Sequence, residues 1–409
     1  MSQVQLKIES VLSFIVQNKM LLSLFFVFLI IYLIAWNRGL PLLYLIAELS
    51  LATLVLSLIA PYFNLLGISA QVNHPKQAQQ GETIPIRIEL ESSGFFAKYF
   101  LELWWNVPFS EQTKHMFFIT KLGKKQIINA ELLCEIRGAH KTGPLMLQTG
   151  FPLGIKVFTK MFEESNDSVL VLPRTVQIHD FSFSADESSV LHGDNQSERK
   201  GGHDEFVSVR EYKPGDSPRY IHWPTSARKG ELMVREYQDT LSSSLVIMLD
   251  LHKDYNVGRG KETTLEYAIT IAASLATYAL DEGYRVSIFG YAKEKVKLVD
   301  IKGSHNIQMV LETLAYAKCD GDERYEDALS HFLSYHKRGG TLVLFDNGSE
   351  TVEKKMDTYA AQFFKPVLFD IKASSFKKNA FYKDFSVVHQ SRQSKYILEK
   401  GCDLERMFR

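Results

Sequence analysis

Two long apolar runs near the start of the chain restrict what this sequence can fold into. Residues 20–36 (MLLSLFFVFLIIYLIAW) carry no charge, and residues 40–63 carry a single one, at Glu48. Seventeen helical residues extend about 26 Å, close to the roughly 30 Å hydrocarbon core of a bilayer. A cleaved signal peptide would have a shorter apolar region and no second run. We therefore predict a transmembrane helical hairpin within residues 1–66, because a helix satisfies its own backbone groups in lipid.

A hairpin places both of its flanks on one side of the membrane. The flanks carry several basic residues and the three-residue turn carries one, Arg38 against Lys7, Lys19, His74, Lys76 and Arg87. Basic residues favour the cytoplasmic side, so we expect the main body to be cytoplasmic.

Glu48 falls near the middle of the second span, where an ionised carboxylate is costly. One interpretation is a proton or ion site. The other is a protonated or hydrogen-bonded group that helps the two helices pack, near Tyr32 or Ser23. Neither run holds a partner acid or base, which favours packing.

The remaining composition is that of a folded protein of two or three domains. The chain has 409 residues, 45% hydrophobic and 23% charged, and its 47 basic residues balance its 47 acidic ones. This balance gives no overall attraction to nucleic acid. Three widely separated cysteines exclude a disulfide scaffold and a cysteine-rich zinc module.

Residues 70–175 predict a small antiparallel β-sandwich or barrel. Ile84–Leu90 alternates apolar and polar side chains with the period of a strand, and four further segments have strand character, 99–107, 116–120, 127–136 and 168–172. Residues 176–204 are polar over most of their length and rich in Ser, Gly and charge, which indicates a linker or loop.

Residues 241–409 alternate buried-strand runs with helical patterns, which predicts an α/β domain with a doubly wound, mostly parallel sheet. The strands are expected at 245–249, 284–290, 296–301, 341–346 and 366–371, with the second and third paired as one antiparallel hairpin. Helices are expected at 262–282, 304–317, 323–337 and 350–362. Ligands of such sheets bind beyond the carboxyl ends of the strands, where Asp250 and Asp346 stand.

A dense polar segment, residues 205–240, lies between the two soluble domains. It resembles the signature of the bacterial "domain of unknown function 58" family, roughly R-E-Y-x-x-G-D-x-x-R-x-I-D-W-x-x-S-A-R-x-G-x-L. The matching positions are Arg210, Glu211, Tyr212, Gly215, Asp216, Arg219, Ile221, Trp223, Ser226, Ala227, Arg228, Gly230 and Leu232. The sequence departs from the pattern at His222, where the family usually has Asp, and at Pro224, where it often has Lys.

The resemblance covers nearly the whole chain. Arg137-Gly138, Gly143-Pro144 and Phe151–Gly154 are similar to the family's R-G…G-P…P-F-G-L run. The family layout implies paired membrane helices, a β domain and a von Willebrand factor A-like α/β domain, here in a bacterial inner membrane. It also implies association with MoxR-type AAA+ ATPases.

The signature has two physical interpretations. Eight basic and eight acidic residues over 198–239 argue against a nucleic-acid surface. Arg210, Arg219 and Arg228 with Glu211 and Asp216 are suited to forked ion pairs around Trp223. Such a network would either hold the β domain onto the α/β domain or present a surface to a protein partner.

A von Willebrand A-like domain commonly holds Mg²⁺ through D-x-S-x-S, a later Thr and a later Asp. Here Asp250 and Asp346 match, whereas His252, Lys253 and Asp254 occupy the rest of the first loop and no Thr lies near 319–323. A hard cation needs several oxygen ligands, so we interpret Asp250, Asp254 and Asp346 as degenerate metal-site positions and expect no cofactor.

Three functions follow in order of preference. The first is a non-enzymatic, membrane-anchored adaptor for a MoxR-type AAA+ ATPase in the assembly or maturation of envelope or metal-containing complexes. The second is a divalent-metal-dependent adhesion or ligand-sensing module. The third is a hydrolase using His222 and Ser226, although no complete set of nucleophile, base and orienting group is visible.

Overall fold

The structure is a computed structural model. It describes residues 19–408, apart from a set of short segments, 163–167, 180, 182, 184–204, 213–220, 239–243, 295, 336–339, 348–350, 361–362, 364, 378–384 and 391–392. The chain divides into two compact units, Met1–Val171 and Leu172–Arg409.

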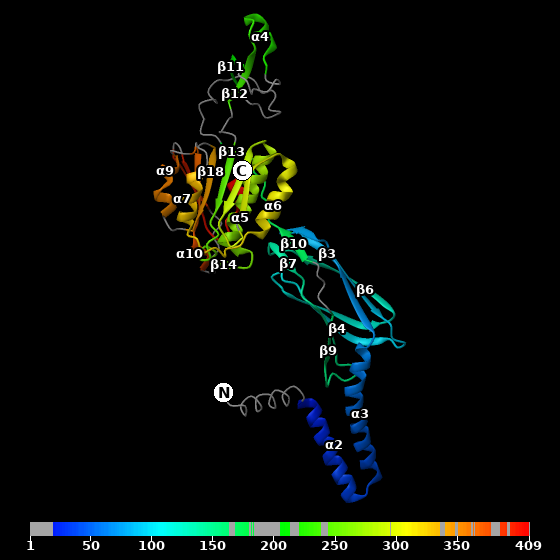
Figure 1. Cartoon of the computed structure of the whole chain (residues 1–409). Coiled ribbons are helices and arrows are strands. Elements are labelled where there is room, and N and C mark those ends of the chain that lie inside the picture. The colour runs from blue at the N-terminus through cyan, green and yellow to red at the C-terminus, as the bar shows by residue number, and fades with distance from the viewer. Residues whose placement is uncertain are drawn as a thin grey trace. The chain divides into compact units, whose positions relative to one another are not determined.

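The first unit begins with the two predicted helices, α2 (Lys19–Arg38) and α3 (Pro41–Leu65), which lie side by side (Figure 1). Both are long and apolar enough to cross a membrane, and little of either is buried within the protein. Gly39 turns the chain between them with a φ of 62°, which favours glycine.

Small side chains mark the contact between the two helices. Ala35 and Ala47 are fully buried, and the rings of Tyr32 and Tyr44 meet edge to face at 6.0 Å. The side chain of Glu48 is exposed. It therefore projects away from the helix pair, which differs from the packing role that the sequence favours.

Short antiparallel strands follow α3. They form three small sheets, ordered β1-β3-β6, β2-β10-β7 and β5-β4-β8-β9. The strands are β1 (Ile68–Asn73), β2 (Gln77–Gln79), β3 (Thr83–Ser92), β4 (Lys98–Asn106), β5 (Lys114–Leu122), β6 (Lys125–Leu133), β7 (Gly138–Lys141), β8 (Leu145–Thr149), β9 (Phe158–Met161) and β10 (Ser168–Leu172). All five predicted strands are confirmed, and five further strands join them.

Buried and exposed side chains alternate along the strands, and the buried ones form one apolar core in this unit. Ile84, Ile86 and Ile88 of β3 point inward and pack with side chains from β4 such as Leu103 and Trp105. The Trp105 indole N–H donates to the Gly143 carbonyl at 3.2 Å. A Cβ at Gly143 would lie 2.9 Å from the Asn106 side chain, so this close approach requires glycine.

The second unit holds a seven-stranded sheet ordered β17-β16-β13-β18-β19-β21-β20. Its strands are β13 (Ser244–Leu249), β16 (Arg285–Gly290), β17 (Val296–Lys302), β18 (Thr341–Asp346), β19 (Lys365–Ile371), β20 (Ser386–Gln390) and β21 (Gln393–Leu398). Four inner pairings are parallel, and β16–β17 pair as the predicted hairpin. The prediction of a single antiparallel hairpin was incomplete, because β20 and β21 form a second one at the opposite edge.

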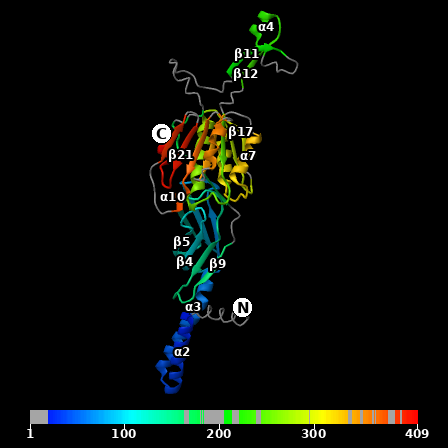
Figure 2. The same ribbon diagram turned by 90° about the vertical axis from the view of Figure 1, so that its left-hand side faces the viewer.

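Helices cover both faces of this sheet (Figures 1 and 2). They are α5 (Thr264–Asp281), α6 (Ile307–Tyr316), α7 (Tyr325–Tyr335), α8 (Thr351–Lys354), α9 (Met356–Ala360), α10 (Ala373–Lys377) and α11 (Leu404–Met407), with a 3₁₀ turn, η4 (Ser304–Asn306), and a small β14–β15 pair (Gly258–Arg259, Glu262–Thr263). The Thr263 hydroxyl caps α5 by accepting the Glu266 N–H at 3.2 Å. The single helix predicted over 350–362 is instead two short ones, α8 and α9.

Part of the predicted linker belongs to the second unit. Val176, Ile178, Phe181 and Phe183 are buried, and the Phe183 ring lies 4.7 Å from that of Tyr284. The described portion of 176–183 therefore packs as core, because it carries an apolar side chain at every second or third position. Residues 184–204 lie outside the described residues.

Candidate functional site

Three aspartates mark the carboxyl ends of three adjacent parallel strands. Asp250 directly follows β13, Asp346 ends β18, and Asp370 is the penultimate residue of β19. Asp346 and Asp370 are register partners, and the β13–β18 register continued by two residues sets Asp250 opposite Asp346. Partners in parallel register project from the same face, so these three residues, the aspartate row, lie on the face that α7 and α9 cover.

Asp250 is the electrostatically unusual member of the row. Its pKa is raised to about 7, mainly by burial and to a smaller extent by the nearby charge of Asp346, whereas the hydrogen bond from the His252 N–H opposes the shift. That N–H donates to Asp250 Oδ1 at 3.0 Å. Asp250 is therefore poised to gain or lose a proton near neutral pH.

Two buried tyrosines lie close to the row. The Tyr325 hydroxyl donates to the Met248 carbonyl at 2.9 Å and accepts the Phe345 N–H at 3.4 Å. The Tyr255 hydroxyl is buried without a hydrogen-bond partner in the described part of the chain. Burial, assisted by the charge of Asp250, raises the pKa of both phenols well above its usual range, so both stay neutral.

Asp370 is paired with lysines instead. Its Oδ2 lies 2.7 Å from Lys372 Nζ and 3.3 Å from Lys395 Nζ, and Lys395 also reaches Glu353 at 2.6 Å. Burial alone would lower the pKa of Lys395, but Glu353 and Asp370 together raise it. This end of the row is thus an ion-pair network in which a buried Asp370 meets partly exposed lysines, whereas the Asp250 end has a protonatable acid.

The loop 319–323 packs against the loop that follows β13. The Gly321 N–H donates to the Leu251 carbonyl at 3.0 Å, and the Gly321 carbonyl accepts the Lys253 N–H at 3.0 Å. A Cβ on Gly321 would meet the Tyr291 carbonyl oxygen at 2.3 Å, so glycine is required there. The Cys319 thiol faces the Asp250 carbonyl at 3.8 Å.

The side chains present do not fit a magnesium cage. The structure brings Asp250 and Asp346 together, but the Asp254 side chain is 82% exposed and lies 3.7 Å from the His252 ring. Lys253 places an ammonium in the same loop, 3.0 Å from Asp322. Among the residues that the structure describes, no cluster of three or more His, Cys, Asp or Glu side chains could hold a metal ion.

The signature segment forms a β-hairpin interrupted by a short helix. Strands β11 (Glu205–Glu211) and β12 (Met233–Gln238) pair antiparallel, and α4 (Trp223–Lys229) precedes β12. Gly230 ends α4 in the left-handed conformation, with φ 75°.

Ser226 holds this segment together. Its buried hydroxyl accepts the Met233 N–H at 2.8 Å and donates to the His222 carbonyl at 3.0 Å. His222 caps α4, because its Nδ1 accepts the Thr225 N–H at 3.3 Å and lies 2.7 Å from the Thr225 hydroxyl. Asp, which the signature pattern has at this position, is also a preferred cap residue, so a capping role fits both side chains.

Other signature side chains point outward. Glu211, Ala227 and Arg228 are exposed, and the Trp223 side chain is 65% exposed. Tyr212 is half-buried, and its N–H donates to the Leu232 carbonyl at 2.9 Å. Gly215, Asp216 and Arg219, and the side chain of Arg210, lie outside the described residues, so the predicted ion-pair network around Trp223 stays a prediction.

Sequence reasoning missed Asp370 and the two buried tyrosines. A signal for Asp370 exists, because the tripeptide Leu-Phe-Asp occurs at 344–346 and again at 368–370, and the two copies are in register on neighbouring strands. For Tyr255 and Tyr325 the sequence offers no such signal, since their burial depends on the packing of loops.

Comparison with known proteins decides the family. Residues 208–362, which include most of the signature segment and the row members Asp250 and Asp346, match the model described as "Protein of unknown function DUF58". This part of the chain belongs to the DUF58 family. The chain is also 28% identical over 199 residues to "Uncharacterized protein YeaD" of Bacillus subtilis (strain 168), which covers 48% of this chain and 47% of that protein. The chain thus matches about half the length of this relative.

Two solved structures that match the chain are remote likenesses. A β-glucosidase from Listeria innocua matches with a TM-score of 0.16 and 10% identity, over 25% of this chain and 16% of that one. The Pseudomonas fluorescens alkylpurine DNA glycosylase AlkC, bound to DNA containing an abasic site analog, matches with a TM-score of 0.16 and 16% identity, over 34% and 42%. At such scores neither likeness carries an argument about fold or activity.

Proposed function

We propose that this protein is a membrane-anchored, non-enzymatic adaptor whose signature hairpin docks a protein partner. The family resemblance makes a MoxR-type AAA+ ATPase the expected partner, in the assembly or maturation of envelope or metal-containing complexes. The two apolar helices support the anchor, and the basic flanks of those helices support an inner-membrane location with a cytoplasmic body. The parallel sheet with Asp250 after β13 supports a von Willebrand A-like second unit.

One observation carries this proposal. Trp223 is 65% exposed, yet it begins a helix fixed by the His222 cap and by the buried Ser226 hydroxyl. An exposed tryptophan on a firmly held backbone is typical of a protein-binding hot spot, because little conformational entropy is lost on docking. The exposed Arg228 and the 46% exposed Leu232 extend the same surface.

The hydrolase alternative finds no support in this geometry. The Ser226 hydroxyl is buried and held by backbone groups of His222 and Met233, and the His222 Nδ1 faces Thr225. A nucleophile needs a base in hydrogen-bonding contact, and these contacts engage the Ser226 hydroxyl and the His222 ring with other groups, which disfavours this pair for that role.

The experiment compares binding of a purified MoxR-type ATPase to the full chain in lipid nanodiscs. We expect Trp223→Ala to weaken the affinity at least tenfold, because truncating a hot-spot anchor typically costs about 2 kcal/mol or more. Tyr316→Ala is the matched control, since it removes a 52% exposed aromatic side chain from another site of the same unit. Tyr316→Ala should bind as the wild type does.

Two results would count against the proposal. If the wild-type chain captures no ATPase at micromolar concentrations, the adaptor function is wrong. If Trp223→Ala and Tyr316→Ala bind equally well, the hairpin is not the docking surface.

A further inference from the structure

The end of α3 is built into the β domain. The buried Asn64 side chain donates to the Tyr99 carbonyl at 2.7 Å and accepts the Tyr99 N–H at 3.0 Å. Lys98 Nζ donates to the Phe63 carbonyl at 2.6 Å, where an ammonium satisfies a carbonyl in the last turn of the helix. These hydrogen bonds hold the start of β4 against the last turn of α3.

The backbone at this end is distorted so that aromatic side chains face outward. Phe100 has a φ of 51°, a conformation that bulky residues rarely adopt. As a result Tyr99 and Phe100 are both exposed, although neighbours in a strand normally alternate. The Thr149 hydroxyl holds the strained residue by donating to its carbonyl at 3.0 Å. Strained backbone conformations of this kind are concentrated at functional and ligand-binding sites.

Further aromatic residues gather around the same place. Phe95 and Phe96, in the loop between β3 and β4, are 96% and 77% exposed and touch edge to face at 5.4 Å. Phe100 stacks on Phe151 at 5.9 Å and lies 6.2 Å from Phe118. We name this set the aromatic collar: Tyr62, Phe63, Phe95, Phe96, Tyr99, Phe100, Phe118 and Phe151.

Two cavities adjoin the collar. The first is a mainly apolar groove of about 480 Å³, with Ala60 and Phe63 of α3 on one side and Phe95, Phe96 and Phe151 on the other. Ala60 lies five residues before the end of α3, so the groove runs along roughly the last 7 Å of the helix. That length matches the depth at which interfacial side chains enter a bilayer, about 5–10 Å.

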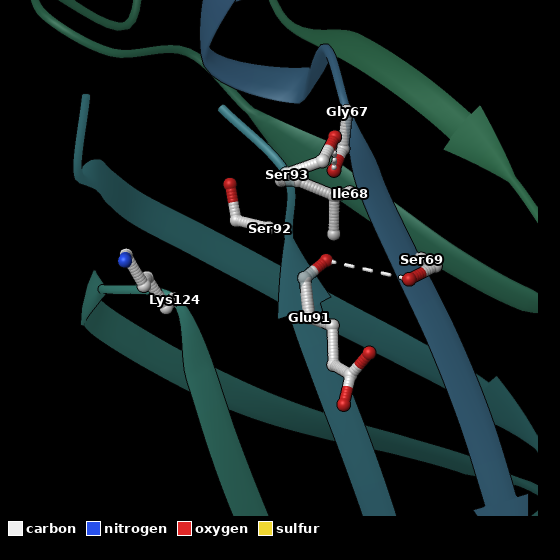
Figure 3. Close-up of a pocket in the computed structure, with 7 residues that line it drawn as sticks. All are labelled: Gly67, Ile68, Ser69, Glu91, Ser92, Ser93 and Lys124. Carbon is white, nitrogen blue, oxygen red and sulfur yellow. Dashed lines mark hydrogen bonds between the residues drawn. The ribbon is translucent and has the colours of Figure 1, made fainter. Parts of the chain in front are cut away.

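The second cavity is polar and about 420 Å³ in volume, and shares Gly67 with the groove (Figure 3). Lys124 lies on one side and Ser69 on the other, with Ser92 and Ser93 between them (Figure 3). Ser92 is 7% exposed, and its buried hydroxyl has no hydrogen-bond partner in the described part of the chain. A buried unpaired hydroxyl is costly, and a bound acceptor would remove that cost.

We propose that this end of the β domain is a phospholipid-docking surface, in which the aromatic collar enters the bilayer interface and the polar cavity receives a lipid headgroup phosphate. The inference rests on the proposed membrane anchoring by α2 and α3, which brings the collar to the lipid. Aromatic rings settle at this depth because they are apolar with a polarisable face, and a lysine beside serine hydroxyls suits an anionic phosphate. The function is to hold the β domain directly on the membrane.

The test measures the depth of spin labels in nanodiscs of phosphatidylcholine and phosphatidylglycerol. The full chain carries Cys319→Ser as background and one label, at Phe95→Cys, at Leu45→Cys or at Lys114→Cys. Leu45 is a 63% exposed residue of α3, and Lys114 is an exposed residue at the other end of the β4–β5 pair. We expect Leu45 and Phe95 labels to be relaxed mainly by oxygen, and the Lys114 label mainly by a water-soluble nickel chelate.

The labels separate the two possible failures. A Leu45 label in water would show that the membrane anchoring itself is wrong. A Leu45 label in lipid with a Phe95 label as accessible to nickel as Lys114 would overturn the docking surface alone. A Phe95 label that is shielded in native membranes but exposed in lipid nanodiscs would also overturn it, in favour of a protein partner.

The headgroup cavity has its own readout. Native mass spectrometry of the full chain released from the same nanodiscs counts the phosphatidylglycerol molecules that stay bound. We expect Lys124→Gln to retain at least threefold less phosphatidylglycerol than the wild type, and Lys114→Gln, which removes an equal charge elsewhere, to retain as much. Equal retention by the two variants would remove the headgroup site from the proposal.

Discussion

At the scale of single residues, Asp250 should make the folded second unit less stable as pH rises. Most aspartates have a lowered pKa in the folded state and act in the opposite direction. Its pKa is about 7 in the folded protein, against 3.8 as the ordinary value. The native state therefore holds a proton that the unfolded state releases between about pH 4 and 7. The free energy of unfolding of the second unit should fall as pH rises through this window, by up to about 4 kcal/mol.

Asp250→Asn tests this contribution, because the amide oxygen keeps an acceptor for the His252 N–H without the charge. At pH 8 the variant should be more stable than the wild type by roughly 2–4 kcal/mol, and at pH 4 the difference should vanish. Urea unfolding of the second unit at pH 4 and at pH 8 measures this difference in stability. Asp254→Asn, at an 82% exposed side chain, is the control and should show no such dependence. An equal gain at both pH values would contradict the prediction.

At the scale of elements, the short helix α4 depends on the cap that His222 supplies. We expect His222→Ala to speed hydrogen exchange of the Thr225 amide about fivefold, since losing a cap costs about 1 kcal/mol. His222→Asp should leave that exchange unchanged or slow it, because a carboxylate caps and also favours the positive end of the helix dipole. If the Asp and Ala variants exchange equally fast, the His222 side chain is not the cap.

Elements with a strong local pattern could be predicted from the sequence. The two long apolar runs predict α2 and α3, the alternation over Ile84–Leu90 predicts β3, and the apolar run at 341–346 predicts β18. Strands such as β7 (Gly138–Lys141) are too short and polar to show a period, and they exist because their neighbours supply the pairing. The second antiparallel hairpin, β20–β21, was missed for a similar reason.

The candidate site was predictable only in part. Asp250 and Asp346 stand out because each ends an apolar run, but the burial that raises the pKa of Asp250 comes from loops far along the chain. The signature marks Trp223 and Ser226 equally, and only the fold shows that one is exposed and the other buried. The positive φ of Phe100 has no local cause in the sequence, since it depends on Asn64 and Thr149.

At the scale of the whole molecule, each compact unit contains one buried cysteine. Cys134 belongs to the core of the first unit, and burial raises the pKa of its thiol to about 11. Cys402 lies in the second unit, where burial raises the pKa of its thiol to about 12. Both thiols should be inert in the folded protein, because only the thiolate is a nucleophile. Each therefore reports the unfolding of its own unit.

Brief alkylation at increasing urea should accordingly give two separate labelling transitions. Leu147→Ala removes a fully buried side chain from the first core and should move the Cys134 transition to lower urea, consistent with a loss of about 2–5 kcal/mol, while leaving that of Cys402 in place. Ile247→Ala, fully buried in β13, should do the reverse. Mass spectrometry of the labelled peptides measures both transitions in one sample. If either substitution shifted the two transitions together, the two units would unfold as one cooperative body, and the prediction of independent unfolding would be wrong.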